Sequence, residues 1–157
     1  MSSHTVTTAT QSDVQTKSLS LALDIPLIAV NTLEALCYQV NIEEGLKIPL
    51  IDARRMEVFG GVYSEDNQMV KENFNLVIGS DSFSEIEEKK YLFGNGADKL
   101  KEVLAENKTV QFIDNIFCTA TGMVEISERK FKQKDFEDVA YFEPNYGKEF
   151  YTVPSNK

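Results

Sequence analysis

Two short polar stretches contain the residues whose types and spacing could support chemistry. In the first, Asp52, Arg54 and Arg55 interrupt the apolar run from Ile48 to Tyr63. Two guanidinium groups could bind a phosphate bidentately, and the aspartate beside them could orient water or a metal ion. The same residues could form the polar turn of a hairpin or a partner surface. Because phosphate sites normally add a glycine-rich backbone or a helix N-terminus, we favour the structural hairpin.

The second stretch is the glycine turn Gly94-Asn95-Gly96, followed by Ala-Asp-Lys. Two glycines before a helix could expose backbone N–H groups to an anion such as a nucleotide phosphate. The Lys-Ser/Thr ending of a P-loop is missing, however, and a tight strand-to-helix turn with positive φ explains both glycines. We therefore expect a structural turn and keep nucleotide contact as the weaker alternative.

The remaining reactive residue types predict no catalytic centre, no metal site and no cofactor. His4 is the only histidine, so a histidine metal site or a Ser-His-Asp triad lacks a member. Cys37 and Cys118 lie far apart in apolar surroundings, which is typical of buried, reduced thiols. The acidic clusters are expected to be solvated helix faces and loop caps.

Length and charge limit the class of protein. A chain of 157 residues with 42% hydrophobic residues can form one globular domain with a real core. A net charge of -9 argues against a broad surface for nucleic acid or anionic membrane, because either would need clustered Lys and Arg. No apolar run approaches the roughly 20 residues of a membrane span, and the start lacks a secretory pattern. We expect a soluble, cytoplasmic protein.

Hydrophobic periodicity and turn residues predict the elements that position these stretches. After a Ser- and Thr-rich start, we expect a short helix over 13–23, a buried strand over 24–31, and a helix over 32–40. The strands that follow form a three-strand meander over 48–53, 57–63 and 69–78. The rest alternates between helices and buried strands: helix 80–90, strand 91–93, helix 97–107, strand 109–116 and helix 118–133.

From residue 47 onward the predicted order is therefore β-β-β-α-β-α-β-α. An antiparallel meander followed by strands that alternate with helices requires a mixed sheet whose last strands are parallel. This is the order of the ribonuclease-H-like fold, so the expected class is α/β.

Four segments resemble the second half of the bacterial TsaB (YeaZ) family. They are "ALDIPLIAVNTLEAL", "IDARRMEVFGGVY", "LFGNGADK" and "EDVAYFEPNYGKEF", and they occur in the family's order at similar spacings. Each motif alone is weak evidence for the family, but together the four extend from about Leu21 to Phe150. The resemblance rests on all four motifs in this order.

The resemblance implies a fold of the actin-like ATPase superfamily, built from two ribonuclease-H-like subdomains. It also implies a non-catalytic scaffold in the synthesis of N6-threonylcarbamoyladenosine at position 37 of tRNA. Its partners would be the TsaD-like transferase and a TsaE-like ATPase, with a homodimer for the full-length form. The older glycoprotease (peptidase M22) label has no support in these residues.

The sequence departs from the family at its start, where the Asp-Thr-Ser strand and the G-P-G-S-[FY]-T-G-[LI]-R segment do not appear. We therefore expect a truncated form whose own pairing is weak or absent. Its expected parts are a tail (1–18), a remnant of the first subdomain with a linker (19–46), the second subdomain (47–150) and a flexible end (151–157). The alternatives are a nucleotide-binding or kinase-like enzyme of the superfamily, and a non-functional product that self-associates through a sheet edge.

Overall fold

The computed structural model describes residues 13–53 and 55–144, and their helices and strands broadly follow the expected order. Three helices and two short 3-10 helices are present in this part of the chain: α1 (Asp13–Leu23), α2 (Thr32–Cys37), η1 (Asp98–Leu100), η2 (Ala120–Met123) and α3 (Val124–Gln133). The strands are β1 (Leu46–Asp52), β2 (Glu57–Tyr63), β3 (Met69–Val77), β4 (Lys90–Phe93) and β5 (Val110–Ile113).

The five strands form one mixed sheet in the order β3-β2-β1-β4-β5. β1 pairs antiparallel with β2, and β2 pairs antiparallel with β3, which confirms the predicted meander. β4 joins β1 in parallel, and β5 joins β4 in parallel. The strands are rich in β-branched and aromatic residues, which suit a pleated, half-buried surface.

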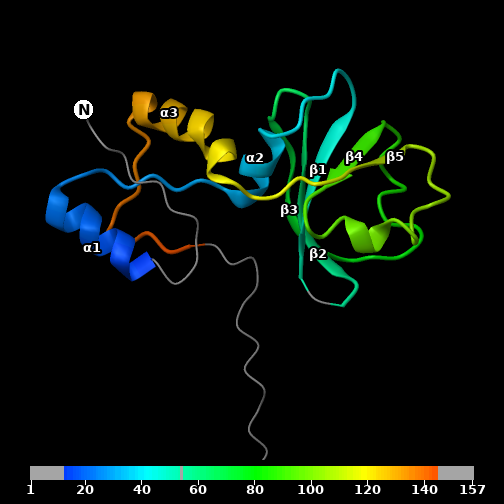
Figure 1. Ribbon diagram of the computed structural model, residues 1–157, viewed down its shortest axis with the longest axis horizontal. Coiled ribbons are helices and arrows are strands. Elements are labelled where there is room, and N and C mark those ends of the chain that lie inside the picture. Colours follow the sequence, from blue (N-terminus) through cyan, green and yellow to red (C-terminus); the bar gives the residue numbers. More distant parts are fainter. Residues whose placement is uncertain (1–12, 54, 145–157) are drawn as a thin grey trace, which may run out of the picture.

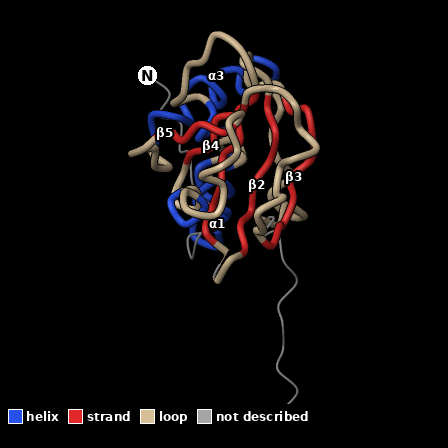
Figure 2. The backbone as a smooth tube through the Cα atoms, turned by 90° about the vertical axis from the view of Figure 1, so that its right-hand side faces the viewer, coloured by secondary structure: helices blue, strands red, loops and turns tan. Residues whose placement is uncertain are grey.

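Side chains pack on both faces of the sheet. α1, α2 and α3 lie together on one side, and the segments that join β3 to β4 and β4 to β5 cover the other (Figure 1). The tube in Figure 2, seen from the sheet side, shows the three helices grouped behind the strands. Leu33, Leu36 and Cys37 of α2 pack against Tyr63 and Phe93. The opposite core contains the following buried residues: Ile48, Leu50, Val58, Ile78, Phe83, Leu92, Ala97, Leu100 and Leu104.

α2 also carries the second helix layer. Ala35 packs against Met123 of η2 and Ile126 of α3, while Arg129 donates to Glu34 (2.8 Å) and to the Tyr38 hydroxyl (2.6 Å). The six-residue helix is therefore covered by the sheet on one side and by α3 on the other.

Three segments have a secondary structure that differs from the predicted one. Residues 24–31 form no strand, since only Leu27 makes an isolated bridge with Glu137. Residues 80–85 are successive turns instead of a helix, because Phe83 inserts into the core with φ +64°, which a helix cannot accommodate. Residues 97–107 bury Ala97, Leu100 and Leu104, but only η1 is helical and turns follow it.

The first predicted helix is confirmed with its bounds, since α1 spans Asp13–Leu23. Residues 13–18 therefore belong to a helix and not to the expected tail. His4 and residues 151–157 lie outside the described residues, as does Arg54. No helix in the described part of the chain has both the length and the apolar character needed to cross a membrane.

Candidate functional site

The sheet topology brings the two polar stretches together. β1 ends at Asp52 and its parallel neighbour β4 ends at Phe93, so the segments that follow them leave the sheet at the same end of the two strands. The Asn95 side-chain oxygen accepts a hydrogen bond from the backbone N–H of Asp52 (3.1 Å). The Gly96 N–H donates to the carbonyl of Leu50 (3.0 Å). We call this contact between residues 50–57 and 94–99 the turn junction.

Backbone fills the space beside both glycines of the turn. Gly94 has φ +98°, and a Cβ there would lie 2.4 Å from the Leu50 carbonyl oxygen. A Cβ on Gly96 would lie 2.8 Å from the carbonyl carbon of Ile51. Because neither contact involves a flexible side chain, only glycine fits at these positions. The glycines thus have a structural role in the described fold.

Two N–H groups at the glycine turn donate to acceptors within the protein. The Gly96 N–H bonds to Leu50, and the Ala97 N–H donates to the Gly94 carbonyl (3.0 Å). η1, which follows, has only three residues. A phosphate cradle needs several N–H groups that point at the ligand, so this geometry favours the structural explanation of Gly94, Asn95 and Gly96.

Lys99 is the central side chain of the turn junction, and the sequence did not single it out. Its ammonium group bonds to the Asp52 carboxylate and donates to the carbonyls of Arg55 (2.8 Å) and Glu57 (2.6 Å). It therefore fixes the turn between β1 and β2 from the side of the glycine turn. Its place directly after Gly-Asn-Gly-Ala-Asp is the only sequence signal that could have found it.

Of the two arginines, Arg55 lies among the described residues. It is in the turn between β1 and β2, as the hairpin interpretation predicts, with φ +47°. Its side chain is exposed, and none of the described residues forms an ion pair with it. Lys99 pairs with the Asp52 carboxylate.

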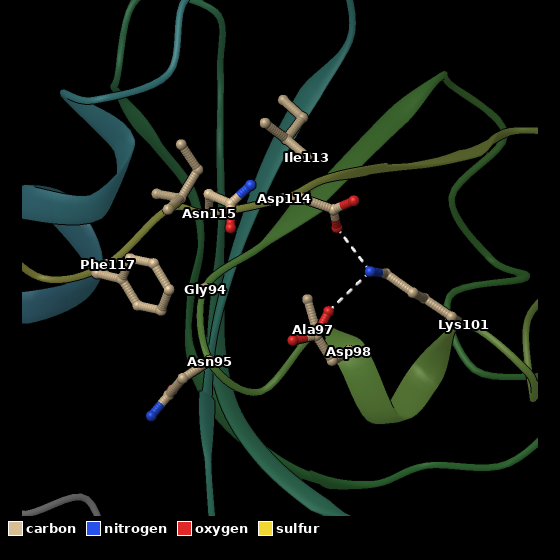
Figure 3. Close-up of a pocket in the computed structure, with 10 residues that line it drawn as sticks. Gly94, Asn95, Ala97, Asp98, Lys101, Ile113, Asp114, Asn115 and Phe117 are labelled. Atoms are coloured by element: carbon tan, nitrogen blue, oxygen red, sulfur yellow. Dashed lines mark hydrogen bonds and ion pairs between the residues drawn. The ribbon is translucent and has the colours of Figure 1, made fainter.

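A cavity of about 240 Å³ lies beside the turn junction, at the carboxyl ends of β4 and β5. Its walls include Gly94, Asn95 and Phe117. Figure 3 shows the Lys101 ammonium between Asp98 (2.7 Å) and Asp114 (2.6 Å). The hydrogen bonds that the Lys101 ammonium donates to Asp114 and Asp98 raise the pKa of Lys101. With two carboxylates and one ammonium, the cavity has no excess positive charge for an anionic ligand.

Metal-ligand and cysteine side chains are the remaining candidates for chemistry in the described residues. In residues 13–53 and 55–144, no group of three or more His, Cys, Asp or Glu side chains is placed to hold a metal ion. Cys37 is buried, and desolvation raises its pKa to about 12, so the thiol stays protonated. Cys118 is exposed, which corrects the expectation of a buried thiol, because it lies in the irregular segment between β5 and η2.

Comparisons with known proteins identify the family. Residues 14–142 match the family model described as "TsaD: tRNA N6-adenosine threonylcarbamoyltransferase", and the chain belongs to this family. A relative from Bacillus subtilis (strain 168), "tRNA threonylcarbamoyladenosine biosynthesis protein TsaB", is 39% identical over 56 residues. That match covers 36% of this chain and 24% of the relative. The resemblance to TsaB (YeaZ) proteins is thereby confirmed.

Two solved structures from Pseudomonas aeruginosa share the fold. The first, YeaZ, has a TM-score of 0.68 at 17% identity, covering 86% of this chain and 66% of that chain. The second, "an uncharacterized protein with similarity to peptidase YEAZ", has a TM-score of 0.65 at 18% identity, covering 86% and 65%. The α/β, ribonuclease-H-like class is thus confirmed. The chain spans less than two thirds of the length of each protein.

Proposed function

We propose that the chain is a non-catalytic partner subunit of the machinery that makes N6-threonylcarbamoyladenosine at position 37 of tRNA. The catalytic partner in this proposal is a TsaD-like protein, a TsaE-like ATPase joins them, and the work takes place in the cytoplasm. The family match and the described role of the Bacillus subtilis relative support this reading. The proposal differs from the peptidase label of the second structural neighbour.

The proposal that the chain is non-catalytic is supported by the hydrogen bonds at the turn junction, where polar groups bond to other groups of the protein. The Asn95 amide oxygen and the Lys99 ammonium both bond to protein groups, and so do the N–H groups of Gly96 and Ala97. A catalytic site needs polar groups that point at the reacting atoms. Here the two motifs of the turn junction hold the end of β1 in place. Such a structural role is the one expected of a scaffold protein.

α1 supplies a surface on which a partner could bind. Its buried side chains include the polar residues Thr16 and Ser20, whereas Val14 and Leu21 are 75% and 71% exposed. Leu19 and Leu23 are exposed as well. Such an inverted pattern leaves apolar area in water that an interface would cover.

The size of this surface agrees with the expectation of weak pairing by this chain. A helix of 11 residues is about 16 Å long, so it covers less than a standard interface of roughly 1,600 Å². We expect a dissociation constant in the micromolar range or weaker.

The experiment is isothermal titration calorimetry of the 157-residue chain with the TsaD-like protein of the same genome, which measures the dissociation constant. We expect measurable binding that a Val14→Ser/Leu21→Ser double variant weakens about tenfold, because its apolar contact area is lost. Val124→Ser is the matched control, since Val124 is an exposed apolar residue on another helix. No binding by the unmodified chain at millimolar concentration would contradict the proposed pairing.

A further inference from the structure

We propose that the cavity at the carboxyl ends of β4 and β5 binds an arginine side chain that a partner protein presents. The arginine site is inferred from the geometry of the described residues alone. Its assignment to the TsaD-like protein rests on the proposed function, because that is the partner with which the chain is proposed to assemble.

The position and size of the cavity suit a single side chain. Its walls come from residues 94–101, which follow β4, and from residues 113–117 at the end of the parallel strand β5. In open α/β sheets, ligands bind outside the carboxyl ends of the strands. The volume of about 240 Å³ lies below the roughly 300–1,000 Å³ of pockets for drug-sized ligands, so a side chain fits better than a nucleotide.

The charged wall of the cavity selects a cation. Asp98 and Asp114 contribute two carboxylates, and Lys101 contributes the only positive charge among the lining residues. One oxygen of each carboxylate accepts from the Lys101 ammonium, at 2.7 and 2.6 Å. A carboxylate has about four lone-pair positions, and these two side chains are 78% and 59% exposed, so both can accept from a further donor.

The opposite wall of the cavity is apolar. Phe117 is 60% exposed, and Ile113 and Ile116 beside it in the chain are partly buried. In Figure 3 the Phe117 ring lies on the other side of the cavity from the Lys101 ion pairs. A long side chain with an apolar stem and a charged end can therefore place its stem against the ring and its charge at the carboxylates.

Both walls are held by bonds to the rest of the fold. The Gln39 amide donates to the Phe117 carbonyl (2.8 Å) and accepts from the Thr119 hydroxyl (2.9 Å). On the other side, the Asn95 side chain accepts from the Asp52 N–H at the turn junction. A cavity that is already formed needs little ordering when a ligand binds, which favours affinity.

Charge and geometry together favour arginine as the occupant. The net charge of the chain is -9, and that of the cavity wall is also negative, so both attract a cation and repel the phosphates of a nucleic acid. Lys101 draws Asp98 and Asp114 to one point, where the planar fork of a guanidinium can donate to both carboxylates. The single ammonium of a lysine offers no such fork. Arginine is also enriched among the residues that dominate binding energy at protein interfaces.

The first experiment tests the site with N-acetyl-arginine amide as the probe. The probe is titrated into the isotope-labelled 157-residue chain, and the chemical shifts of the backbone amides are followed. We expect saturable shifts at residues 98 and 114–117, with a millimolar dissociation constant for a probe of roughly 15 non-hydrogen atoms. N-acetyl-lysine amide should bind more weakly, because it lacks the fork.

Two matched variants locate the charge that the probe needs. Asp114→Asn should weaken arginine binding about fivefold, because a charge-assisted hydrogen bond becomes a neutral one. Glu102→Gln removes the same charge from an exposed residue outside the cavity wall and should leave the affinity unchanged. Absence of saturable shifts, or equal weakening by both variants, would overturn the site. Equal affinity for the two probes would overturn the assignment to arginine.

The second experiment asks whether the TsaD-like protein supplies the arginine. Calorimetry with Asp114→Asn should show about a fivefold rise in the dissociation constant, whereas Glu102→Gln should bind as the unmodified chain does. If the probe binds but Asp114→Asn leaves this affinity unchanged, the assignment to that partner is wrong. If the unmodified chain does not bind the TsaD-like protein, the proposed function fails, and the titration with the probe still decides the arginine site.

Discussion

α1 and α2 follow one another in the chain but have opposite relations to the core. α2 buries Leu36 and Cys37 against the sheet and Ala35 against the helix layer. α1 buries Thr16 and Ser20 and exposes its leucines. The difference shows that α2 is needed to complete the fold, whereas α1 carries apolar surface that the described fold does not use. A comparison of the two helices therefore separates residues that stabilise the fold from residues that we propose to bind a partner.

The largest expected effect comes from matched leucine truncations. Leu36→Ala removes a side chain that is 2% exposed and should lower the free energy of unfolding by about 3 kcal/mol, through lost burial and the cavity left behind. Leu21→Ala should change it by less than about 0.5 kcal/mol, because the side chain is in water in both states. Urea denaturation of both variants checks this. Equal losses would show that α1 belongs to the core.

A pH effect should follow from Cys37 on the inner face of α2. Burial raises its pKa from 9.0 to about 12, so the unfolded chain loses this proton at lower pH than the folded protein does. The stabilisation is complete below pH 9 and is lost as pH rises toward 12, by roughly 2 kcal/mol between pH 9 and 11.

Cys37→Ala tests this assignment, because the variant should show a flatter pH dependence of the free energy of unfolding in the same range. Lys47 lies close to the thiol, and desolvation lowers its pKa, which gives a contribution of opposite sign. Lys47→Met should therefore steepen the loss. A profile unchanged by Cys37→Ala would show that the thiol is hydrated.

The smallest effect concerns the polar side chains that accompany each helix. The Asn31 side-chain oxygen caps α2 by accepting from the N–H groups of Leu33 (2.8 Å) and Glu34 (3.4 Å). Asn31→Ala should cost about 1 kcal/mol. The Ser18 hydroxyl on α1 donates to the Val14 carbonyl on an exposed face, so Ser18→Ala should be neutral within about 0.3 kcal/mol. Thermal unfolding distinguishes the two.

Sequence reasoning succeeded where local pattern and long-range packing agree. The meander was predicted because its strands are separated by short polar turns, and the parallel pairing followed from the alternation of elements. The segment 80–90 failed because capping residues and charges favour a helix locally, while burial of Phe83 at positive φ requires turns. The segment 97–107 was predicted as a helix, and it does bury Leu100 and Leu104, but their spacing did not fix the backbone form.

At the candidate site, the motifs were visible but their connection was not. Asp52 and Gly94 are separated by more than forty positions, and only the parallel pairing of β1 with β4 brings them together. The role of Lys99 depends on that pairing, since its bonds reach Asp52, Arg55 and Glu57 across the junction. The exposure of α1 could not be predicted either, because periodicity shows which residues share a face but not whether anything covers it.

The strand order β3-β2-β1-β4-β5 also has a consequence for the rate of folding. The two hairpins close short loops, whereas pairing of β1 with β4 closes the much longer loop of residues 53–89. Closure of the longer loop is entropically slower, so we expect the meander to form early and β4 to dock late. The Gly94 turn meets β1 in that last step. A Gly94→Ala variant should therefore unfold faster while folding at nearly the same rate.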